Sequence, residues 1–213
     1  MNLIQTTDLP HLQGSSSFPD FKIFRKGDRI YSQGEISEGY YLLKKGTVKL
    51  HKKLPKGSQT IMRIVFEGEI FGDGFSNQNQ SNLNSALVIE EDTLVQKLDS
   101  PKINTLEIKH QFHLQLQEQN NQMAVRHNRF LALEAEERIT SLLYDLAIKK
   151  GRKFGDETLL KINLTHEEIA FLADTSRPVV SKILSSLKKS GLINYSRNRF
   201  LFRNIAQFKP LIS

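Results

Sequence analysis

The first part of the chain, from about Phe18 to Leu98, places short apolar and aromatic segments between closely spaced glycines. Tyr40–Leu43 is one such segment, and Thr47–Leu50 is another. Short runs of branched and aromatic residues bounded by turn residues are typical of β-strands, and many of them in succession are typical of a roll or barrel. The pattern predicts an antiparallel β jelly roll in residues 1–101, with a polar loop from Asn77 to Asn84.

Residues 102–133 contain neither glycine nor proline and are rich in leucine, glutamine, glutamate and lysine. This composition favours one uninterrupted helix, about 48 Å long at roughly 1.5 Å per residue. Leu116, Met123 and Phe130 recur every seven residues, which is the repeat of a coiled coil. The segment therefore predicts a helix through which two copies of the chain form a dimer. The alternative is a helix that packs on its own β domain.

Two different rows of side chains, or seams, along this helix include Leu116, Met123 and Phe130. The favoured seam is apolar at five of its seven positions and runs through Phe112, Leu116, Gln119, Met123, Arg126, Phe130 and Leu133. The alternative seam is apolar at three of six positions, because it adds His113, Asn120 and His127 instead. The five apolar residues of the favoured seam are the predicted dimer contacts.

Residues 134–213 change the pattern again. They predict a helix from Glu136 to Lys150, a short strand from Thr158 to Ile162, two further helices and a terminal hairpin. The hairpin strands are Leu192–Ser196 and Phe200–Arg203, with a turn near Asn198. This order is typical of a winged helix-turn-helix domain. The predicted fold class is therefore α+β, with an N-terminal antiparallel β jelly roll, a long dimerisation helix and a C-terminal winged helix-turn-helix domain.

The segment from Leu164 to Ile193 carries the helix-turn-helix pattern. Thr165 and Glu168 have the spacing of a capping box, so a helix is expected to begin there. Asp174–Ser176 supplies a tight turn and a second N-cap, and Pro178 fits the first turn of the second helix, where no intrahelical amide is needed. The apolar stripe of this second helix is Val180, Ile183, Leu184 and Leu187. The residues that remain outward are Arg177, Ser181, Lys182 and Ser185.

These outward residues suit the major groove of DNA, because arginine and lysine donate to guanine O6 and N7 and a helix N-terminus favours phosphate. The charge distribution supports this interpretation, since Ser176–Ser213 carries eight basic residues and no aspartate or glutamate. A folded segment with one sign of charge is typical of a phosphate-facing surface. The alternative is an amphipathic surface helix with incidental charge. Further predicted DNA contacts are Thr165, Lys188, Arg197 and Arg199.

With these motifs the chain resembles the Crp/Fnr family of bacterial transcription regulators, from Phe21 to Phe208. The resemblance rests on Phe24–Leu50 and Phe66–Phe75, which look like the strand-turn pattern of a cyclic-nucleotide-binding roll, and on the helix-turn-helix. It implies a homodimer on a palindromic site in double-stranded DNA, with RNA polymerase as a further partner. It also implies that the base-reading positions are Arg177, Pro178 and Lys182. Pro178 stands where cyclic-AMP-responsive members have a glutamate, so the same half-site is not implied.

The resemblance also marks an effector pocket, and here the chain departs from the family. The family pairs Gly-Glu with a downstream Arg-Ser or Arg-Thr, and that arginine neutralises a cyclic phosphate. The corresponding positions are Gly72, Asp73, Asn84 and Ser85. Met123 and Ala124 align with the helix residues that meet adenine, and seam packing is the preferred role of Met123. The pocket is therefore expected to be degenerate and DNA binding to be independent of cyclic AMP, with the effector, small molecule or protein, unidentified.

Composition bears on other classes of function. The chain has no cysteine, which excludes disulfides, thiolate zinc sites and cysteine-ligated iron-sulfur clusters. His110 and His113 lie three residues apart on the long helix, but a solvated face explains them better than a metal or haem site. No catalytic motif is found, so neither an enzyme nor a cofactor is expected. Two alternatives stay open, a haem or gas sensor on the same scaffold and a non-DNA adaptor whose basic face binds protein or RNA.

The expected location is the cytoplasm. The first 17 residues lack the pattern of a secretory signal, and no run approaches the roughly 18 apolar residues of a membrane span. The formal net charge of +7 and the sequence pI of about 9.5 suggest a polyanionic partner.

Overall fold

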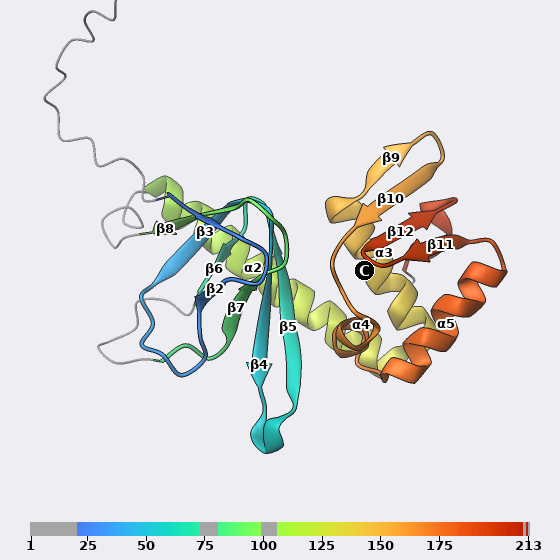
Figure 1. Ribbon diagram of the computed structural model, residues 1–213, viewed down its shortest axis with the longest axis horizontal. Coiled ribbons are helices and arrows are strands. Elements are labelled where there is room, and N and C mark those ends of the chain that lie inside the picture. The colour runs from blue at the N-terminus through green and yellow to red at the C-terminus, as the bar shows by residue number, and fades with distance from the viewer. Residues whose placement is uncertain (1–20, 73–80, 99–105, 211, 213) are drawn as a thin grey trace, which may run out of the picture.

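The computed structural model describes residues 21–72, 81–98, 106–210 and 212. Figure 1 shows a β roll packed along one part of the long helix α2 (Leu106–Ala132), with a smaller domain of helices and strands beyond its other end. The predicted α+β class is confirmed, since antiparallel sheets precede the long helix and a winged helix-turn-helix follows it.

The roll consists of two four-stranded antiparallel sheets. The first has the order β1 (Phe21–Phe24), β8 (Thr93–Leu98), β3 (Tyr40–Lys45) and β6 (Ile70–Phe71). The second has the order β2 (Arg29–Tyr31), β7 (Ser85–Val88), β4 (Thr47–Lys53) and β5 (Gln59–Phe66). A short 3-10 helix, η1 (Pro55–Gly57), closes the β4–β5 hairpin.

Side chains of the second sheet alternate between the interior of the roll and its outer surface, as the period of a strand requires. Val48 of β4 is fully buried in the roll core, and it pairs with Val65 of β5 and Val88 of β7. The next residue, Lys49, lies on the opposite face, where its ammonium group reaches Glu168 of the C-terminal domain. The outer face of this sheet therefore confronts the domain that follows α2.

The helix α2 turns one face to its own chain and the other outward. Phe112 packs edge-on against Tyr40 of β3, with ring centroids 4.6 Å apart. Arg126 and Arg129 bind groups of the C-terminal domain. The side chains of Leu116, Met123 and Phe130 are instead exposed, by 42, 69 and 51% respectively.

Contacts within the chain cover part of the predicted seam. Phe112 and Arg126 are engaged within the chain, so they do not lie at the centre of an open apolar stripe. The exposed stripe combines Leu116, Met123 and Phe130 with His113, Asn120 and His127, all of them exposed, and this is the alternative seam. Leu133 is half-buried just beyond the end of α2. The roll and the C-terminal domain decide which face of α2 is covered, and the dimer contacts themselves stay a prediction.

The C-terminal domain contains the helices α3 (Ala135–Lys150), α4 (His166–Leu172) and α5 (Arg177–Lys189). Its sheet has the order β11 (Ile193–Ser196), β12 (Arg199–Phe202), β10 (Glu157–Lys161) and β9 (Arg152–Phe154), and η2 (Ile205–Phe208) follows. The bounds predicted for α3, α5, β10 and the hairpin differ from these by at most two residues. The strand β9 was not predicted, because its three residues are all exposed and show no apolar alternation.

One apolar core spans the contact between the roll and the C-terminal domain. Ile61 and Ile64 of β5 belong to the same buried cluster as Ile139 of α3 and Ile169 of α4. The strand β5 packs directly against α4, as the neighbouring positions of β5 and α4 in Figure 1 also indicate. The helix-turn-helix therefore rests on the outer face of the second sheet as well as on α2.

Candidate nucleic-acid interface

The first helix of the helix-turn-helix, α4, begins at the predicted capping box. The hydroxyl of Thr165 accepts a hydrogen bond from the Glu168 amide at 3.2 Å, and the Glu168 carboxylate accepts one from the Thr165 amide at 2.7 Å. Ile169 and Ala170 are buried in the domain core. The small side chain of Ala170 lets α5 cross close to α4.

The turn between α4 and α5 contains Asp174 with a φ of 50°, in the left-handed region that few residues other than glycine and asparagine adopt readily. Ser176 occupies the N-cap position of α5, but its side chain makes no capping hydrogen bond, which corrects that part of the prediction. Pro178 lies in the first helical turn, as predicted. The turn therefore needs support from elsewhere in the chain.

The recognition helix α5 separates apolar from basic side chains. Its buried residues are those predicted, namely Val180, Ile183, Leu184 and Leu187. Arg177, Pro178 and Lys182 are exposed on the opposite face. In the part of the chain that the structure describes, no carboxylate forms an ion pair with Arg177 or Lys182. Their charges are therefore available to an external anion.

Ser181 is only half-exposed, because its hydroxyl lies 2.9 Å from Nδ1 of His166, the first residue of α4. Burial lowers the pKa of His166, and the nearby charge of Arg177 lowers it further. His166 is therefore held neutral at pH 7 and can bond the serine hydroxyl. This contact was not predicted, and it joins the N-terminus of α4 to the outward face of α5.

The predicted wing is the β11–β12 hairpin, whose turn contains Asn198 at a φ of 66°. Arg197 and Arg199 flank that residue and are exposed. The ammonium group of Lys188, at the end of α5, lies 5.4 Å from the ring centroid of Tyr195 in the wing. Lys188 is thus placed against the wing strand β11, whose turn carries Arg197 and Arg199.

Two arginines that the sequence reasoning did not assign to this site hold the turn of the helix-turn-helix. Arg126 of α2 forms a two-point ion pair with Asp174, with N–O distances of 2.6 and 2.9 Å, and donates to the Phe171 carbonyl at 2.7 Å. Arg138 of α3 donates to the carbonyls of Ala173 and Asp174, both at 3.0 Å. Bidentate pairs of this kind fix direction as well as distance. The position of α5 is therefore set by the last turns of α2.

Ion pairs also surround the apolar contact between the roll and the C-terminal domain. Lys49 of β4 pairs with Glu168 of α4, and Lys150 of α3 pairs with Glu90 beyond β7. Burial opposes ionisation of Glu90, but hydrogen bonds from Lys150 and Thr47 outweigh it and lower the pKa of that carboxyl. Glu90 is therefore ionised at neutral pH, which is the form that pairs with the Lys150 ammonium group.

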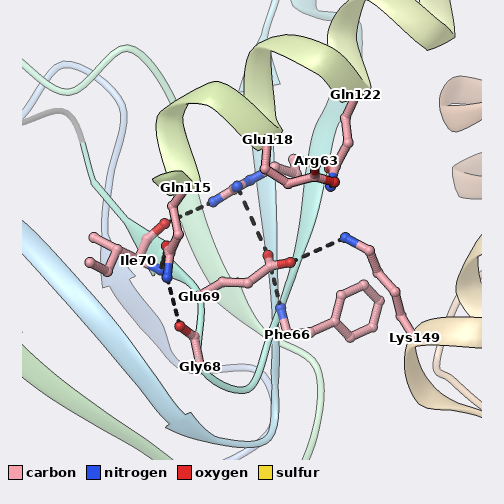
Figure 2. A network of polar contacts seen from close by, with 9 residues as sticks. All are labelled: Arg63, Phe66, Gly68, Glu69, Ile70, Gln115, Glu118, Gln122 and Lys149. Atoms are coloured by element: carbon pink, nitrogen blue, oxygen red, sulfur yellow. Dashed lines mark hydrogen bonds and ion pairs between the residues drawn. The ribbon is translucent and has the colours of Figure 1, made fainter. Parts of the chain in front are cut away.

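A third link runs through the β5–β6 turn, shown in Figure 2. The Glu69 carboxylate lies 3.2 Å from the Lys149 ammonium group of α3 and accepts the Phe66 amide at 3.3 Å. Gln115 of α2 accepts the Ile70 amide at 2.6 Å and donates to the Gly68 carbonyl at 2.9 Å. One turn of the roll therefore contacts both α2 and α3.

The predicted effector residues are partly brought together. Gly72 has a φ of 114°, and a Cβ there would lie 2.5 Å from the Gly39 carbonyl oxygen, so only glycine fits. The Asn84 amide oxygen accepts a hydrogen bond from the Tyr31 hydroxyl at 3.1 Å, and the Ser85 hydroxyl accepts the Gln33 amide at 2.9 Å. Met123 is exposed on α2, and Asp73 lies outside the described residues.

Sequence reasoning missed a cation on the inner face of the roll. Arg63 lies two residues before the fully buried Val65 in β5, on the same face of the strand. It donates to the Ile70 carbonyl at 3.0 Å, and its guanidinium lies 3.9 Å from the Glu69 carboxylate (Figure 2). Burial lowers the pKa of Arg63, and Glu69 opposes that effect. The period of two in β5 placed Arg63 on this face and was the signal that could have found it.

The described residues offer neither a metal-binding cluster nor a membrane-spanning helix. No group of three or more His, Cys, Asp or Glu side chains is arranged there to hold a metal ion. None of the helices in that part of the chain is both long enough and apolar enough to cross a membrane.

Comparison with known families gives two matches. The family described as Cyclic nucleotide-binding domain matches residues 21–108, and the family described as Crp-like helix-turn-helix domain matches residues 137–211. The first match covers the roll and the start of α2, and the second covers the helices and wing just described.

Individual proteins show the same arrangement over most of their length. Transcriptional regulator LdrP from Thermus thermophilus is 28% identical over 185 residues, covering 87% of this chain and 93% of that protein. A CRP-like cAMP-activated global transcriptional regulator from Mycobacterium tuberculosis is 25% identical and covers 80% of this chain and 78% of its own. Among solved structures, a CRP-family transcriptional regulator, also from Thermus thermophilus, superimposes with a TM-score of 0.73 at 26% identity, covering 88% of this chain and 94% of that one.

Proposed function

The chain belongs to the Crp/Fnr family of transcription regulators, and we propose that it acts as a homodimer that binds a palindromic DNA site without requiring cyclic AMP. The observation that carries this proposal is the outward face of α5, where Arg177 and Lys182 are exposed and no described carboxylate pairs with them. Such a face fits the major groove, in which arginine and lysine read guanine. RNA polymerase is the expected partner at promoters.

Each predicted contact has a distinct role in this proposal. Arg177 and Lys182 read base edges, because they stand at the exposed N-terminal half of the recognition helix. Thr165, Lys188, Arg197 and Arg199 bind phosphates and set the register of the protein on the duplex. The side chain of Pro178 has no hydrogen-bond acceptor, so the half-site differs from one read by a glutamate at that position.

The dimer forms through the exposed stripe of α2. An isolated stripe of Leu116, Met123 and Phe130 leaves apolar area in water, at a cost of about 25 cal/mol per Å². Asn120 lies midway along the stripe, and an asparagine at such a position favours one register in two-stranded coiled coils. The family places the two recognition helices of a dimer about one helical turn of DNA apart, roughly 34 Å.

Independence from cyclic AMP is supported by the pocket residues. Binding a cyclic phosphate requires replacement of its lost hydration by a cation or several donors. Asn84 is neutral, and its amide oxygen already accepts the Tyr31 hydroxyl. Arg63 is a cation on the inner face of the roll, and it is engaged by the Ile70 carbonyl and the Glu69 carboxylate.

The test is selection of binding sites from random duplex DNA by the purified full-length chain, with and without cyclic AMP. The expected result is one palindromic motif, enriched equally in both conditions. Enrichment only when cyclic AMP is present contradicts the independence proposed here. Salt-dependent binding without any enriched sequence contradicts specific recognition and supports the adaptor alternative.

A further inference from the structure

A neutral histidine lies against the face of α5 that the proposed function places in the major groove. Nδ1 of His166 lies 2.9 Å from the hydroxyl of Ser181, which stands on α5 between Arg177 and Lys182. His166 is half-buried, and its Nε2 forms no hydrogen bond with any described residue. One ring nitrogen of this imidazole is therefore bonded within the protein, while the other is left for an external partner.

The groups around this imidazole come from three elements. The helix α5 contributes the Ser181 hydroxyl and the charge of Arg177, and β11 contributes the ring of Tyr195, whose centroid lies 5.8 Å from that of His166. On α4 itself, Glu167 is exposed and does not act on the pKa of His166. Burial and then Arg177 lower that pKa. The described part of the free protein thus provides no anion that would stabilise the charged form of the imidazole.

Binding of the recognition helix to DNA changes this electrostatic environment. In helix-turn-helix complexes the first helix crosses the phosphate backbone while the second enters the major groove. His166 belongs to the first helix and contacts the outward face of the second, so it lies at the edge of the groove, close to the phosphates. A nearby negative charge stabilises a protonated imidazole and raises its pKa. DNA therefore supplies the anion that the protein lacks at this position.

We propose that His166 takes up a proton from solvent when the protein binds DNA, and that the resulting imidazolium binds a backbone phosphate through Nε2. The proposal rests on the proposed function, because α5 must first engage a half-site. An imidazolium donates from both ring nitrogens, so Nδ1 then donates to the Ser181 oxygen. The hydroxyl hydrogen of Ser181 is thereby directed away from His166, toward an acceptor on the DNA. One proton thus couples a phosphate contact to the contact that Ser181 makes.

This proton uptake determines how DNA affinity depends on pH. Between the lowered pKa of His166 in the free protein and its raised pKa on DNA, the complex binds more protons than the separate partners. Affinity therefore falls as the pH rises through that range and is constant above it. The limiting slope is about tenfold in affinity per pH unit for each protomer, or about a hundredfold for a dimer on its palindrome.

The test measures the affinity of the full-length protein for the selected palindrome at several salt concentrations, from about pH 5.5 to about pH 8.5. His166→Gln keeps a neutral donor and should lose the pH dependence, with the affinity that the wild-type protein has at high pH. At about pH 6 its salt slope should be smaller than the wild-type slope by about 0.9 per protomer, and at about pH 8 the two slopes should agree. His166→Lys carries a permanent charge and should keep the larger slope throughout.

His110→Gln is the matched control, because it removes an exposed histidine of α2 and should leave the wild-type pH profile unchanged. A wild-type affinity that does not vary with pH, or a pH dependence that persists in His166→Gln, overturns the proposal. NMR titration of His166 in the wild-type protein needs no variant, and a pKa no higher on DNA than in the free protein also overturns it. If the wild-type protein prefers no sequence at any pH, the proposed function fails instead.

Discussion

The helices α2 and α5 are both amphipathic, but they distribute apolar and basic side chains in opposite ways. The helix α5 buries Val180 and Leu184 completely and exposes Arg177 and Lys182. The helix α2 exposes Met123, together with Leu116 and Phe130, and ties Arg126 and Arg129 to the C-terminal domain. Each helix thus leaves in solvent the kind of side chain to which the proposed function assigns a partner outside the chain.

The comparison separates two uses of arginine. Arg177 is exposed without an ion pair among the described residues, so its hydrogen-bond donors remain free for bases or phosphates. Arg126 and Arg129 direct their donors to Asp174, Asp145 and backbone carbonyls. The first kind of arginine should matter for DNA affinity and the second for stability. Substitutions at Arg129 and Arg177 test these two roles of arginine, and a substitution at Met123 tests the apolar face of α2.

The largest expected effect comes from placing a charge on the apolar face of α2. Met123→Glu puts two glutamates in the proposed dimer contact, where burial of an unpaired charge costs roughly 3 kcal/mol. Operator affinity should fall by about a hundredfold, because a dissociated dimer loses one half-site contact. Sedimentation and binding to the selected palindrome measure both consequences.

Leu114→Glu is the matched control for this substitution. Leu114 is 50% exposed on the same helix but lies off the stripe, so the same charge should leave the dimer intact. An unchanged dimer in the Met123→Glu protein would place the interface elsewhere. A monomer in both variants would mean that any charge on α2 disturbs the fold.

The second effect is on stability. Arg129 is 9% exposed, pairs with Asp145 and donates to the Ile212 carbonyl at 2.9 Å. Arg129→Ala should lower the free energy of unfolding by about 2–3 kcal/mol, the lower end for a buried pair because Asp145 remains partly solvated. Urea denaturation measures it. Arg152→Ala, which removes an exposed arginine of β9, should change that free energy by less than about 0.5 kcal/mol, and equal losses would refute the division.

The third effect is on recognition without a change in stability. Arg177→Ala should cost about 1–3 kcal/mol of affinity for the selected site and relax its base preference. Lys188→Ala should instead weaken binding to all sequences similarly and reduce the salt slope by about 0.9 per protomer. Titrations with cognate and scrambled duplexes compare the two variants. Equal loss on both duplexes for Arg177→Ala would show that this residue binds phosphate.

The helix-turn-helix could be predicted from the sequence because its determinants are local. The capping box joins Thr165 to Glu168, three residues apart, and the buried stripe of α5 follows helical spacing. The contacts that position the domain are different, because Arg126 and Asp174 lie 48 residues apart and Lys49 and Glu168 lie 119 apart. No periodicity within a segment indicates which distant residue will neutralise a given charge.

The same limit applies to the long helix and to the inner face of the roll. Either seam of α2 satisfied the heptad repeat, and the choice depended on Phe112 meeting Tyr40 of the roll. Arg63 lies among apolar residues of β5, and its partner Glu69 lies beyond the end of that strand. Tertiary contact decided which face of α2 is covered and which carboxylate lies beside Arg63.

The smallest expected effect is on the pKa of His166, which lies where α4 and α5 meet. Burial and then the charge of Arg177 lower the pKa of His166 below its ordinary value of about 6.5. Between the lowered pKa and the unfolded one, the unfolded chain binds more protons, so the free energy of unfolding rises with pH there. The contribution of neutral His166 is therefore fully present above about pH 6.5 and is lost as the pH falls through the lowered pKa.

Arg177→Ala removes the second of these causes, so the pKa of His166 should move upward while burial keeps it below the ordinary value. NMR titration of the His166 imidazole measures this shift directly. Lys182→Ala is the control, because Lys182 is exposed on the same helix and does not act on His166. If Arg177→Ala leaves the pKa of His166 unchanged, the Arg177 side chain lies too far from α4 to act on it. The N-terminus of α5 would then lie farther from α4 than the contact between His166 and Ser181 indicates.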